Sequence, residues 1–360
     1  MNKIIYGFIA LSVVLSSCKK SEEIIISTEE KMNFRVDIPT SIRNTTAKRL
    51  SSTNNTLDGN DIYGMLGVFV DVGDNAAQIV QEIIWAINLH NLNQATSTSF
   101  IGDDGNNKDL EIVVGTNYEW ELTVTDNISG NNALQVFWNG NSGNGVEGFS
   151  IINMYELDNN NGTLFSDTNV RIDYSEVTSA YDAQMLVQIS DWPVSANSEL
   201  NNLKMFVGKT NDIIDVYGNS NHPGAYIVDS THQDGYNWAF RAHSNEVLNI
   251  AVAEVGLPTT IHNDSLDIFS YYSIHNSLKT EIDNFLGYTY PTAPSTYIDS
   301  ISDAYLVNAI APGYFTGAQG FVASGVAPTS NHSFLNARMT SIDQMPYVPF
   351  NINSLVIPWQ

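Results

Sequence analysis

Residues 118–125 read Tyr-Glu-Trp-Glu-Leu-Thr-Val-Thr, and this stretch decides the fold. Apolar and polar side chains alternate along it without a break. Because successive side chains of a β-strand point to opposite faces, such alternation predicts a strand with one buried face. Similar alternation recurs at Val170–Tyr174, Met185–Ile189 and Leu248–Val252. The stretch Phe100–Val255 is therefore interpreted as one long run of short strands.

Less regular strands are expected at Ala133–Trp138, Gly148–Leu157, Leu203–Val207, Ile213–Tyr217, Ala225–Val228 and Tyr236–Ala242. Segments rich in Asn, Gly and Asp separate the strands, and these residues favour tight turns. The spacing predicts hairpins in an antiparallel meander rather than βαβ units. A run of this length needs protected edges, so we expect a mainly β fold that forms a barrel or a curved half-barrel.

One amphipathic helix is expected over Asp74–His90, because Ile79, Ile83 and Ile87 recur every four residues. We expect it to pack against the β body as part of the core. A plug or lid across the mouth of a curved sheet is the functional alternative. After Pro258 the pattern changes to helical spacing and then to loops, which predicts a helical and irregular C-terminal extension.

Four segments follow from these patterns. An early strand is expected within Lys31–Pro39 and a second strand at Ile62–Val72. The predicted organisation is a signal peptide at 1–17, a tether with the early strand at 18–57, a β body at 58–258 and the C-terminal extension at 259–360.

Charge is distributed unevenly along the 360 residues, whose formal net charge is −24. The first fifty residues hold eight of the fifteen Lys and Arg but five acids, so the remainder carries seven bases and thirty-four acids. A body this acidic repels nucleic acid and anionic lipid headgroups, which argues against a nucleic-acid partner.

The N-terminal residues predict an export signal. Lys3 precedes the apolar run Ile4–Leu15, which is too short to span a membrane as a mature helix. The following Leu15-Ser-Ser-Cys18 resembles the lipobox of bacterial lipoproteins, and Cys18 is the single cysteine of the chain. The resemblance implies cleavage before Cys18, a diacylglycerol-modified cysteine and no internal disulfide. A plain signal peptide with an incidental cysteine is the alternative.

The segment after Cys18 indicates where in the cell envelope the protein is located. Lys19-Lys-Ser-Glu-Glu23 is similar to the export signal of surface lipoproteins that accompany Sus-type nutrient uptake systems. The resemblance implies a lipid anchor in the outer membrane with the body on the cell surface. An ordinary tether facing the periplasm is the alternative, and no Asp directly follows Cys18 to favour the inner membrane.

Residues that could carry chemistry are scattered. Asp103–Asp109 and Asp158–Gly162 are loops without the spacing of a calcium site, so we expect turns. His222, His232 and His243 fall on or beside neighbouring strands, but no paired metal-binding motif is present. The sequence therefore assigns no catalytic residue, no metal and no cofactor.

Aromatic residues are the remaining feature. Trp120, Trp138 and Trp238 fall on expected strands and are the candidate ligand-binding residues, on the wall of a cavity if the sheet curves around one. Outward-facing aromatics at loop ends would instead stack on sugar rings. The leading hypothesis is a lipid-anchored envelope protein that binds a glycan or an apolar small molecule. The alternatives are a structural or envelope-assembly lipoprotein and a surface hydrolase.

The anchor gives the first prediction. Cys18→Ala removes the thiol that the lipobox provides for acylation, so the variant should leave washed membranes and incorporate no labelled fatty acid. Fractionation with radiolabelled palmitate checks this. Equal membrane retention of the wild type and the variant would contradict the lipoprotein assignment.

Overall fold

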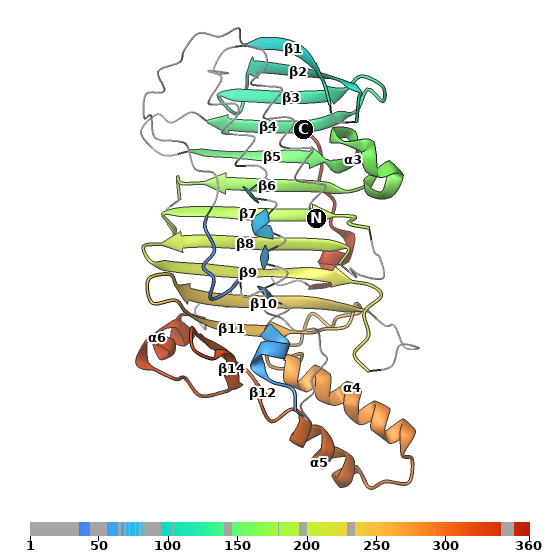
Figure 1. Cartoon of the computed structure of the whole chain (residues 1–360), viewed down its shortest axis with the longest axis vertical. Coiled ribbons are helices and arrows are strands. Elements are labelled where there is room, and N and C mark those ends of the chain that lie inside the picture. Colours follow the sequence, from blue (N-terminus) through green and yellow to red (C-terminus); the bar gives the residue numbers. More distant parts are fainter. Residues whose placement is uncertain are drawn as a thin grey trace. The chain divides into compact units, whose positions relative to one another are not determined.

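A computed structural model gives the structure of the chain (Figure 1). It describes residues 36–43, 56–81, 95–339 and 349–360, apart from residues 64–65, 68–69, 72, 76, 79–80, 103, 140–145, 179, 194–199 and 229–234. The chain divides into two compact units. The first holds Gly73–Pro193 and Val356–Gln360, and the second holds Asp37–Val72 and Val194–Leu355.

The first unit is built on seven antiparallel strands that pair in the order of the sequence. They are β1 (Thr96–Ile101), β2 (Asn107–Val114), β3 (Trp120–Asp126), β4 (Asn132–Asn139), β5 (Glu147–Asn153), β6 (Asn169–Ser175) and β7 (Ala183–Ser190). Helix α3 (Met154–Leu157) and the 3-10 helix η1 (Asn159–Phe165) connect β5 to β6. In the β3–β4 register, buried residues of the core face are opposite each other, as Leu122 is opposite Val136.

The second unit continues the same pattern of neighbours, in the order β8-β9-β10-β11-β13-β14-β12. Its strands are β8 (Asn202–Thr210), β9 (Ile213–His222), β10 (Tyr236–Asn245), β11 (Ile250–Gly256), β12 (Ala309–Ile310), β13 (Gly313–Thr316) and β14 (Gly320–Ser324). Its helices are α4 (Ile274–Thr289), α5 (Ser295–Tyr305), α6 (Ser330–Met339) and the 3-10 helix η3 (Pro349–Ser354). Among the described residues of this unit, only β12, which pairs with β14, runs parallel to its neighbour.

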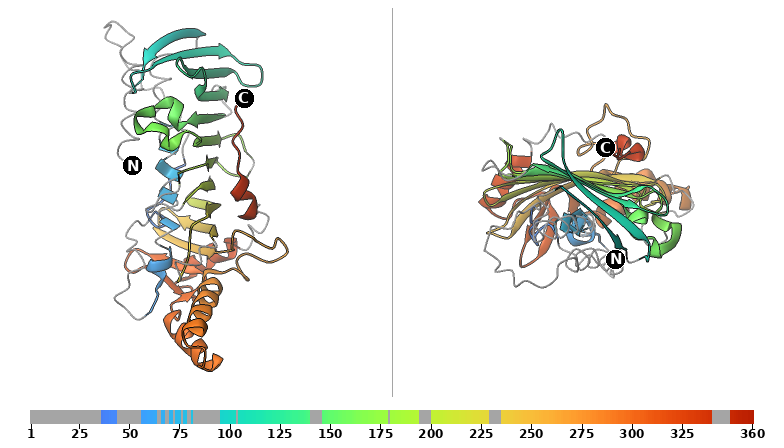
Figure 2. Two further views of the ribbon diagram at one scale, coloured as in Figure 1. Left: turned by 90° about the vertical axis from the view of Figure 1, so that its right-hand side faces the viewer. Right: turned by 90° about the horizontal axis from the view of Figure 1, so that it is seen from above.

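These orders confirm the predicted mainly β meander with helices in the C-terminal extension. Within the described residues no pairing closes either order on itself, so the strands form an open, curved sheet rather than a closed barrel (Figure 2). Among the same residues, no helix combines the length and the apolar character that a membrane crossing requires.

The first unit buries both faces of its central strands. On the core face lie side chains such as Leu122, Val136 and Ile172, all at most 2% exposed. On the opposite face, Phe137, Phe149 and Ile151 pack around Ile357 of the C-terminal segment. This arrangement explains why β4 and β5 are apolar at consecutive positions and not at alternate ones, as strands buried on two sides are.

The C-terminal segment is held to this opposite face by side-chain amides. The Gln135 side chain donates to the carbonyl oxygen of Gln360 at 3.0 Å and accepts from its amide nitrogen at 3.1 Å. The Trp359 indole donates to Asn169 Oδ1 at 3.3 Å. These bonds satisfy polar groups that the packing of Ile357 removes from water.

In the second unit, three asparagines on one face of the sheet contact η3. Asn202 donates to the carbonyl oxygen of Ile352 at 2.7 Å, and Asn237 donates to that of Pro349 at 2.8 Å. Asn221 lies between them in the register and donates to Asn353 Oδ1 at 2.7 Å. Buried amides on neighbouring strands therefore fix a segment that is more than one hundred residues away in sequence.

The N-terminal part corrects two predictions. The described residues of Ile62–Val72 are helical, not a strand. The helix starts after Asp58, whose Oδ1 accepts from the amides of Asn60 and Asp61, while Asp61 Oδ2 accepts from the Asp58 amide. Such reciprocal bonds form a capping box. The four-residue spacing of Ile62, Leu66 and Val70, each at most 2% exposed, belongs to this helix.

The other N-terminal predictions are settled in part. Val36–Pro39, the described end of the expected early strand, is not a strand, although Val36 and Ile38 are buried. The described residues of the expected helix Asp74–His90 are helical, and Ala77 is fully buried. The rest of that helix, including Ile83, lies outside the described residues, as do the signal segment and Cys18.

Two further strands expected from the sequence differ from those in the structure. Glu156 and Leu157, expected at the end of a strand, belong to α3, because Asn153 Oδ1 caps that helix by accepting from the amides of Tyr155 and Glu156. Ala225–Val228 is not a strand, since β9 ends at His222 and the chain turns there.

The capping box gives the second prediction. Asp58→Ala removes the acceptor for two helix amides and should lower the free energy of unfolding by about 0.5–2 kcal/mol. Urea unfolding followed by circular dichroism measures the loss. Asp58→Asn keeps a capping oxygen and should cost much less. Equal losses in both variants would contradict the cap.

Candidate functional site

The three tryptophans predicted to line a cavity do not form one site. Trp120 and Trp138 are directly opposite each other on β3 and β4, with ring centroids 6.5 Å apart. Trp138 is only 4% exposed and shares the core face with Leu122 and Val136. Trp238 lies on β10 in the second unit, opposite Ser220. The first two rings thus extend the packed core of the first unit.

The histidines do not converge either. In the β9–β10 register His222 pairs with Tyr236 and His243 pairs with Asp215, so the two imidazoles lie at opposite ends of the strand pair. His232 lies outside the described residues. No group of three or more His, Cys, Asp or Glu side chains suited to a metal ion occurs in the part of the chain that the structure describes.

Ser220 and His222 resemble a nucleophile and its base, with Ser220 Oγ 2.9 Å from His222 Nε2. Ser220 is fully buried, so a substrate does not reach its hydroxyl. Burial also lowers the pKa of His222 to about 3. A base with such a pKa takes up almost no proton at neutral pH, whereas general-base catalysis works best with a pKa near the working pH. The pair serves as a buried hydrogen bond.

A second buried cluster joins α6 to the sheet. His243 Nδ1 lies 2.7 Å from Asp215 Oδ1, and Arg338 donates to both oxygens of that carboxylate at 2.9 and 2.6 Å. Burial alone would raise the pKa of Asp215, but the hydrogen bonds from His243 and Arg338 outweigh it and hold the pKa below its ordinary value. Two cationic or polar donors on one buried carboxylate make a firm attachment for the helix.

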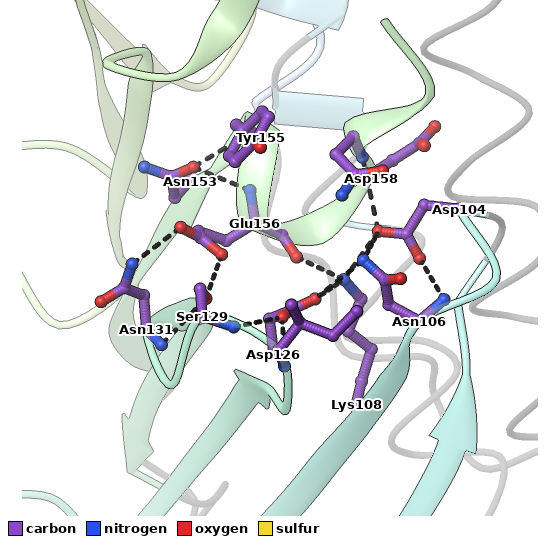
Figure 3. A network of polar contacts seen from close by, with 12 residues as sticks. Asp104, Asn106, Lys108, Asp126, Ser129, Asn131, Asn153, Tyr155, Glu156 and Asp158 are labelled. Carbon is purple, nitrogen blue, oxygen red and sulfur yellow. Dashed lines mark hydrogen bonds and ion pairs between the residues drawn. The ribbon is translucent and has the colours of Figure 1, made fainter. Parts of the chain in front are cut away.

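The most elaborate polar network surrounds Lys108 in the first unit (Figure 3). Its ammonium group bonds Asp104 Oδ2 at 2.8 Å, the carbonyl oxygen of Glu156 at 2.7 Å, and the carboxylate of Asp126. Figure 3 shows these groups coming from the β1–β2 turn, the end of β3 and α3. Lys108 itself is fully buried. The ammonium group of Lys108 therefore fills the position that a metal cation would take among these oxygen atoms.

The network is closed by neutral donors. The Glu156 carboxylate accepts from Ser129 Oγ at 2.5 Å and from Asn131 Nδ2 at 2.8 Å. Burial would raise the pKa of Asp126, but bonds from Lys108 and from the amides of Ser129 and Ile128 outweigh it and lower the pKa. Because every charged group in this cluster has bonding partners, we interpret the cluster as a clamp that holds three chain segments together.

The sequence reading of the two acidic loops is thereby refined. The loop around Asp104 is the β1–β2 turn, as expected, but its neighbour Lys108 supplies the positive charge. Asp158–Gly162 is not a hairpin turn, because Asp158 caps η1 by accepting from the amide of Asn160.

Accessible aromatics gather instead at the tip of the α4–α5 hairpin in the second unit. Tyr288, Tyr290 and Tyr297 are 86%, 56% and 59% exposed. They belong to Tyr-Thr-Tyr-Pro-Thr-Ala-Pro-Ser-Thr-Tyr, residues 288–297, in which Thr and Ser supply hydroxyl groups between the rings. Figure 1 shows α4 and α5 running side by side away from the strands of this unit.

Polar contacts between the helices position the tip. Lys279 on α4 bonds Asp299 and Asp303 on α5 at 3.1 Å each, and Asp283 on its own helix at 3.2 Å. Desolvation lowers the pKa of Lys279, but the hydrogen bonds that its ammonium group donates to these carboxylates raise the pKa above its ordinary value overall. Nearer the tip, Gly287 lies against Ile298, where an added Cβ would be 3.8 Å from its Cδ1. The hairpin is thus fixed while its tyrosines stay accessible.

Sequence reasoning missed this surface. The pattern after Pro258 predicts helices followed by loops, whereas the structure places these tyrosines on the end of α4, which stops at Thr289, on the turn to α5 and at the start of α5. The Pro and Thr content of the loop was the available signal, but the exposure of its tyrosines depends on how two helices pack.

Comparisons with known proteins add no relative. No protein-family model, no curated protein and no solved structure matches this chain. The function therefore has to be argued from the residues themselves, and the aromatic tip is the surface that offers groups to an external ligand.

The Lys108 network gives the third prediction. Lys108→Met leaves two buried carboxylates without their cation and should lower the free energy of unfolding by roughly 3–5 kcal/mol at neutral pH. Urea unfolding measures it. The matched control is Lys209→Met, which breaks an ion pair with Glu246 whose side chains are 35% and 30% exposed, and should cost about 0–1 kcal/mol.

The same variant has a pH signature. Because the pKa of Asp126 is lowered in the folded state, its bonds stabilise the protein above the ordinary carboxyl pKa and are lost as the pH falls through the folded-state value. The stability difference between wild type and Lys108→Met should therefore shrink on acidification. A difference that is small at neutral pH, or that grows in acid, would contradict the clamp.

Proposed function

We propose that this protein is a lipid-anchored envelope lipoprotein that binds a glycan through the aromatic tip of its α4–α5 hairpin. The observation that carries the proposal is the exposure of Tyr288, Tyr290 and Tyr297 on a fixed hairpin. The lipobox at Cys18 and the segment Lys19–Glu23 support an outer-membrane anchor and a surface address.

Aromatic rings suit sugars because the electron-rich ring face attracts the C–H groups on the apolar side of a pyranose. Tyrosine adds a hydroxyl that bonds sugar hydroxyls, and it loses little side-chain entropy on binding. Thr289, Thr292 and Ser295 lie between the tyrosines in sequence and add further donors and acceptors. The tip therefore combines stacking surfaces with hydrogen-bonding groups.

Charge narrows the class of glycan. The hairpin from Ile274 to Tyr305 contains one lysine, Lys279, and four acids, Glu281, Asp283, Asp299 and Asp303. An acidic surface repels uronic-acid or phosphate-bearing polymers. Neutral or amino-bearing glycans are the expected ligands.

An apolar ligand inside the β body receives less support. That hypothesis needs tryptophans on a cavity wall, and Trp138 is buried against Trp120 and core aliphatic residues. The hydrolase alternative is weakened by the burial of the Ser220–His222 pair. A structural lipoprotein remains the alternative that a failed binding test would favour.

The fourth prediction tests the tip. Replacing Tyr288 and Tyr290 together by Ala removes two stacking rings and should weaken glycan binding at least about tenfold, which corresponds to ~1.4 kcal/mol. A glycan array identifies ligands of the wild type, and calorimetry then measures the affinities of the variants.

Two matched variants complete the test. Tyr288→Phe keeps the ring and should retain most of the affinity. Phe334→Ala removes a ring that is 63% exposed on α6, and should leave binding unchanged. Absence of glycan binding by the wild type, or wild-type affinity in the double variant, would contradict the proposal.

A further inference from the structure

The strand β1 ends the order of the first unit, and no described strand pairs with its outer edge. Within the described part of the chain β1 pairs with β2 alone. Figure 1 shows it as the last strand of its unit. A strand in this position presents a row of unpaired N–H and C=O groups to any second strand.

Natural proteins prevent pairing at such edges by placing charged residues or prolines on the edge strand or by keeping that strand very short, and β1 has none of these features. Its sequence Thr-Ser-Thr-Ser-Phe-Ile, residues 96–101, is six residues long and uncharged in a chain of net charge −24. The strand that ends the order of the second unit, β12, has only two residues. Protection is thus present at β12 and missing at β1.

Exposed apolar side chains mark the same place. Of the large hydrophobic residues that are exposed, those on strands belong to β1, β2 and β12, whereas none lies on β3 to β11 among the described residues. On β1 and β2 they are Ile101, Val113 and Val114, at 63%, 37% and 69%. On the strands, exposed large apolar residues are thus found only near the ends of the strand orders among the described residues, and exposed apolar groups gathered in one place are typical of an interaction surface.

We propose that β1 pairs with β1 of a second copy of this chain, in an antiparallel ladder about a two-fold axis at Thr98. The ladder joins the first units of two copies into one continuous sheet. It is a strand addition in which each copy supplies both the edge and the added strand.

Self-pairing fits the sequence of β1. A two-fold axis perpendicular to the sheet keeps each face continuous, so residues of the same face must be paired. With the axis at Thr98, Thr98 is opposite its own copy, Ser97 is opposite Ser99, and Ile101 is opposite Ala95. Hydroxyl side chains then meet hydroxyl side chains, which is a favourable cross-strand pairing, and the exposed Ile101 finds an apolar neighbour.

Electrostatics permit the pairing despite the acidic body. The acids on the neighbouring strand are Asp109 and Glu111, opposite Ser99 and Ser97 in the β1–β2 register. Their counterparts in the second copy would be three strand spacings away, about 14 Å, which exceeds the Debye length of about 8 Å at physiological salt. The positive charge on β2, Lys108, is already paired within its clamp.

The length of the strands favours β1 of a second copy over β12 as the partner of β1. A head-to-tail contact of β1 with β12 would pair six residues with two and would leave most of the edge open. Two copies of β1 pair residues 96–100 with one another, with Thr96 opposite Phe100, and only Ile101 extends to a partner outside the strand, Ala95. Six residues on each side make about six main-chain hydrogen bonds, so the dimer is expected to be weak and concentration-dependent.

Cross-linking provides a sharp test, since Cys18 is the only cysteine. The mature chain from residue 18, carrying Cys18→Ala and Thr98→Cys, places two thiols opposite each other across the axis. Opposed Cα atoms in an antiparallel pair are about 4.5–5.5 Å apart, within disulfide range. Oxidation with diamide should give a covalent dimer. Ser99→Cys is the control, because its two Cα atoms would be roughly 8 Å apart and should link far less.

Sedimentation of the protein without added cysteines gives the second measurement, from about 1 µM to about 1 mM. The Cys18→Ala chain should shift from monomer to dimer with concentration. Thr98→Lys places two like charges opposite each other and should abolish the dimer, whereas Thr123→Lys on the interior strand β3 should not. Circular dichroism confirms that both variants fold. A wild-type edge that stays monomeric throughout, or equal cross-linking of Thr98→Cys and Ser99→Cys, would overturn the proposal.

Discussion

Hydrogen bonding between strands that follow one another in the chain is the interaction on which the rest of the structure depends. Each unit is a meander, so the register of one hairpin fixes the register of the next. The register decides which side chains share a face, as when Trp120 meets Trp138 on the core face. A slip by one residue in any hairpin would move every later side chain to the wrong side.

Segments distant in sequence then cover the faces that this ladder creates. Ile357 fills the apolar cluster of β4 and β5, and η3 lies over the amides of β8 to β10. The covering contacts share one chemistry, because Gln135, Asn202 and Asn237 each bond main-chain groups. An amide side chain offers a donor and an acceptor without a charge, so it can bind a backbone in a buried place at little desolvation cost.

Local patterns were enough to predict much of the fold. Strict alternation identified β3, β6 and β7, and turn residues identified the meander. The strands β1 and β2 were missed because Thr-Ser-Thr-Ser-Phe-Ile carries little apolar alternation and lies at an edge. The helix after Asp58 was taken for a strand because Ile62–Val72 is apolar, although the capping box was present in the sequence.

The candidate sites were less accessible to prediction. The Lys108 clamp joins a turn, the end of a strand and a short helix, and no short pattern brings Asp104, Asp126 and Glu156 together. The tryptophans were chosen because aromatic residues on strands can line a cavity, but packing against a covered face decided their role. The exposure of Tyr288 depends on helix packing that the sequence alone does not reveal.

The covering of β4 and β5 by Ile357 has a consequence for how the chain folds as it is synthesised. Gln135 and its partner Gln360 are separated by 225 residues, so the ladder of the first unit can form long before its cover arrives. Until then Phe137, Phe149 and Ile151 face solvent and form an exposed apolar surface that is prone to aggregation. A chain that emerges from its N-terminus onward therefore passes through a stage in which the sheet exists without its cover. Chaperones that shield apolar surfaces would act at that stage, and the arrival of Ile357 would displace them.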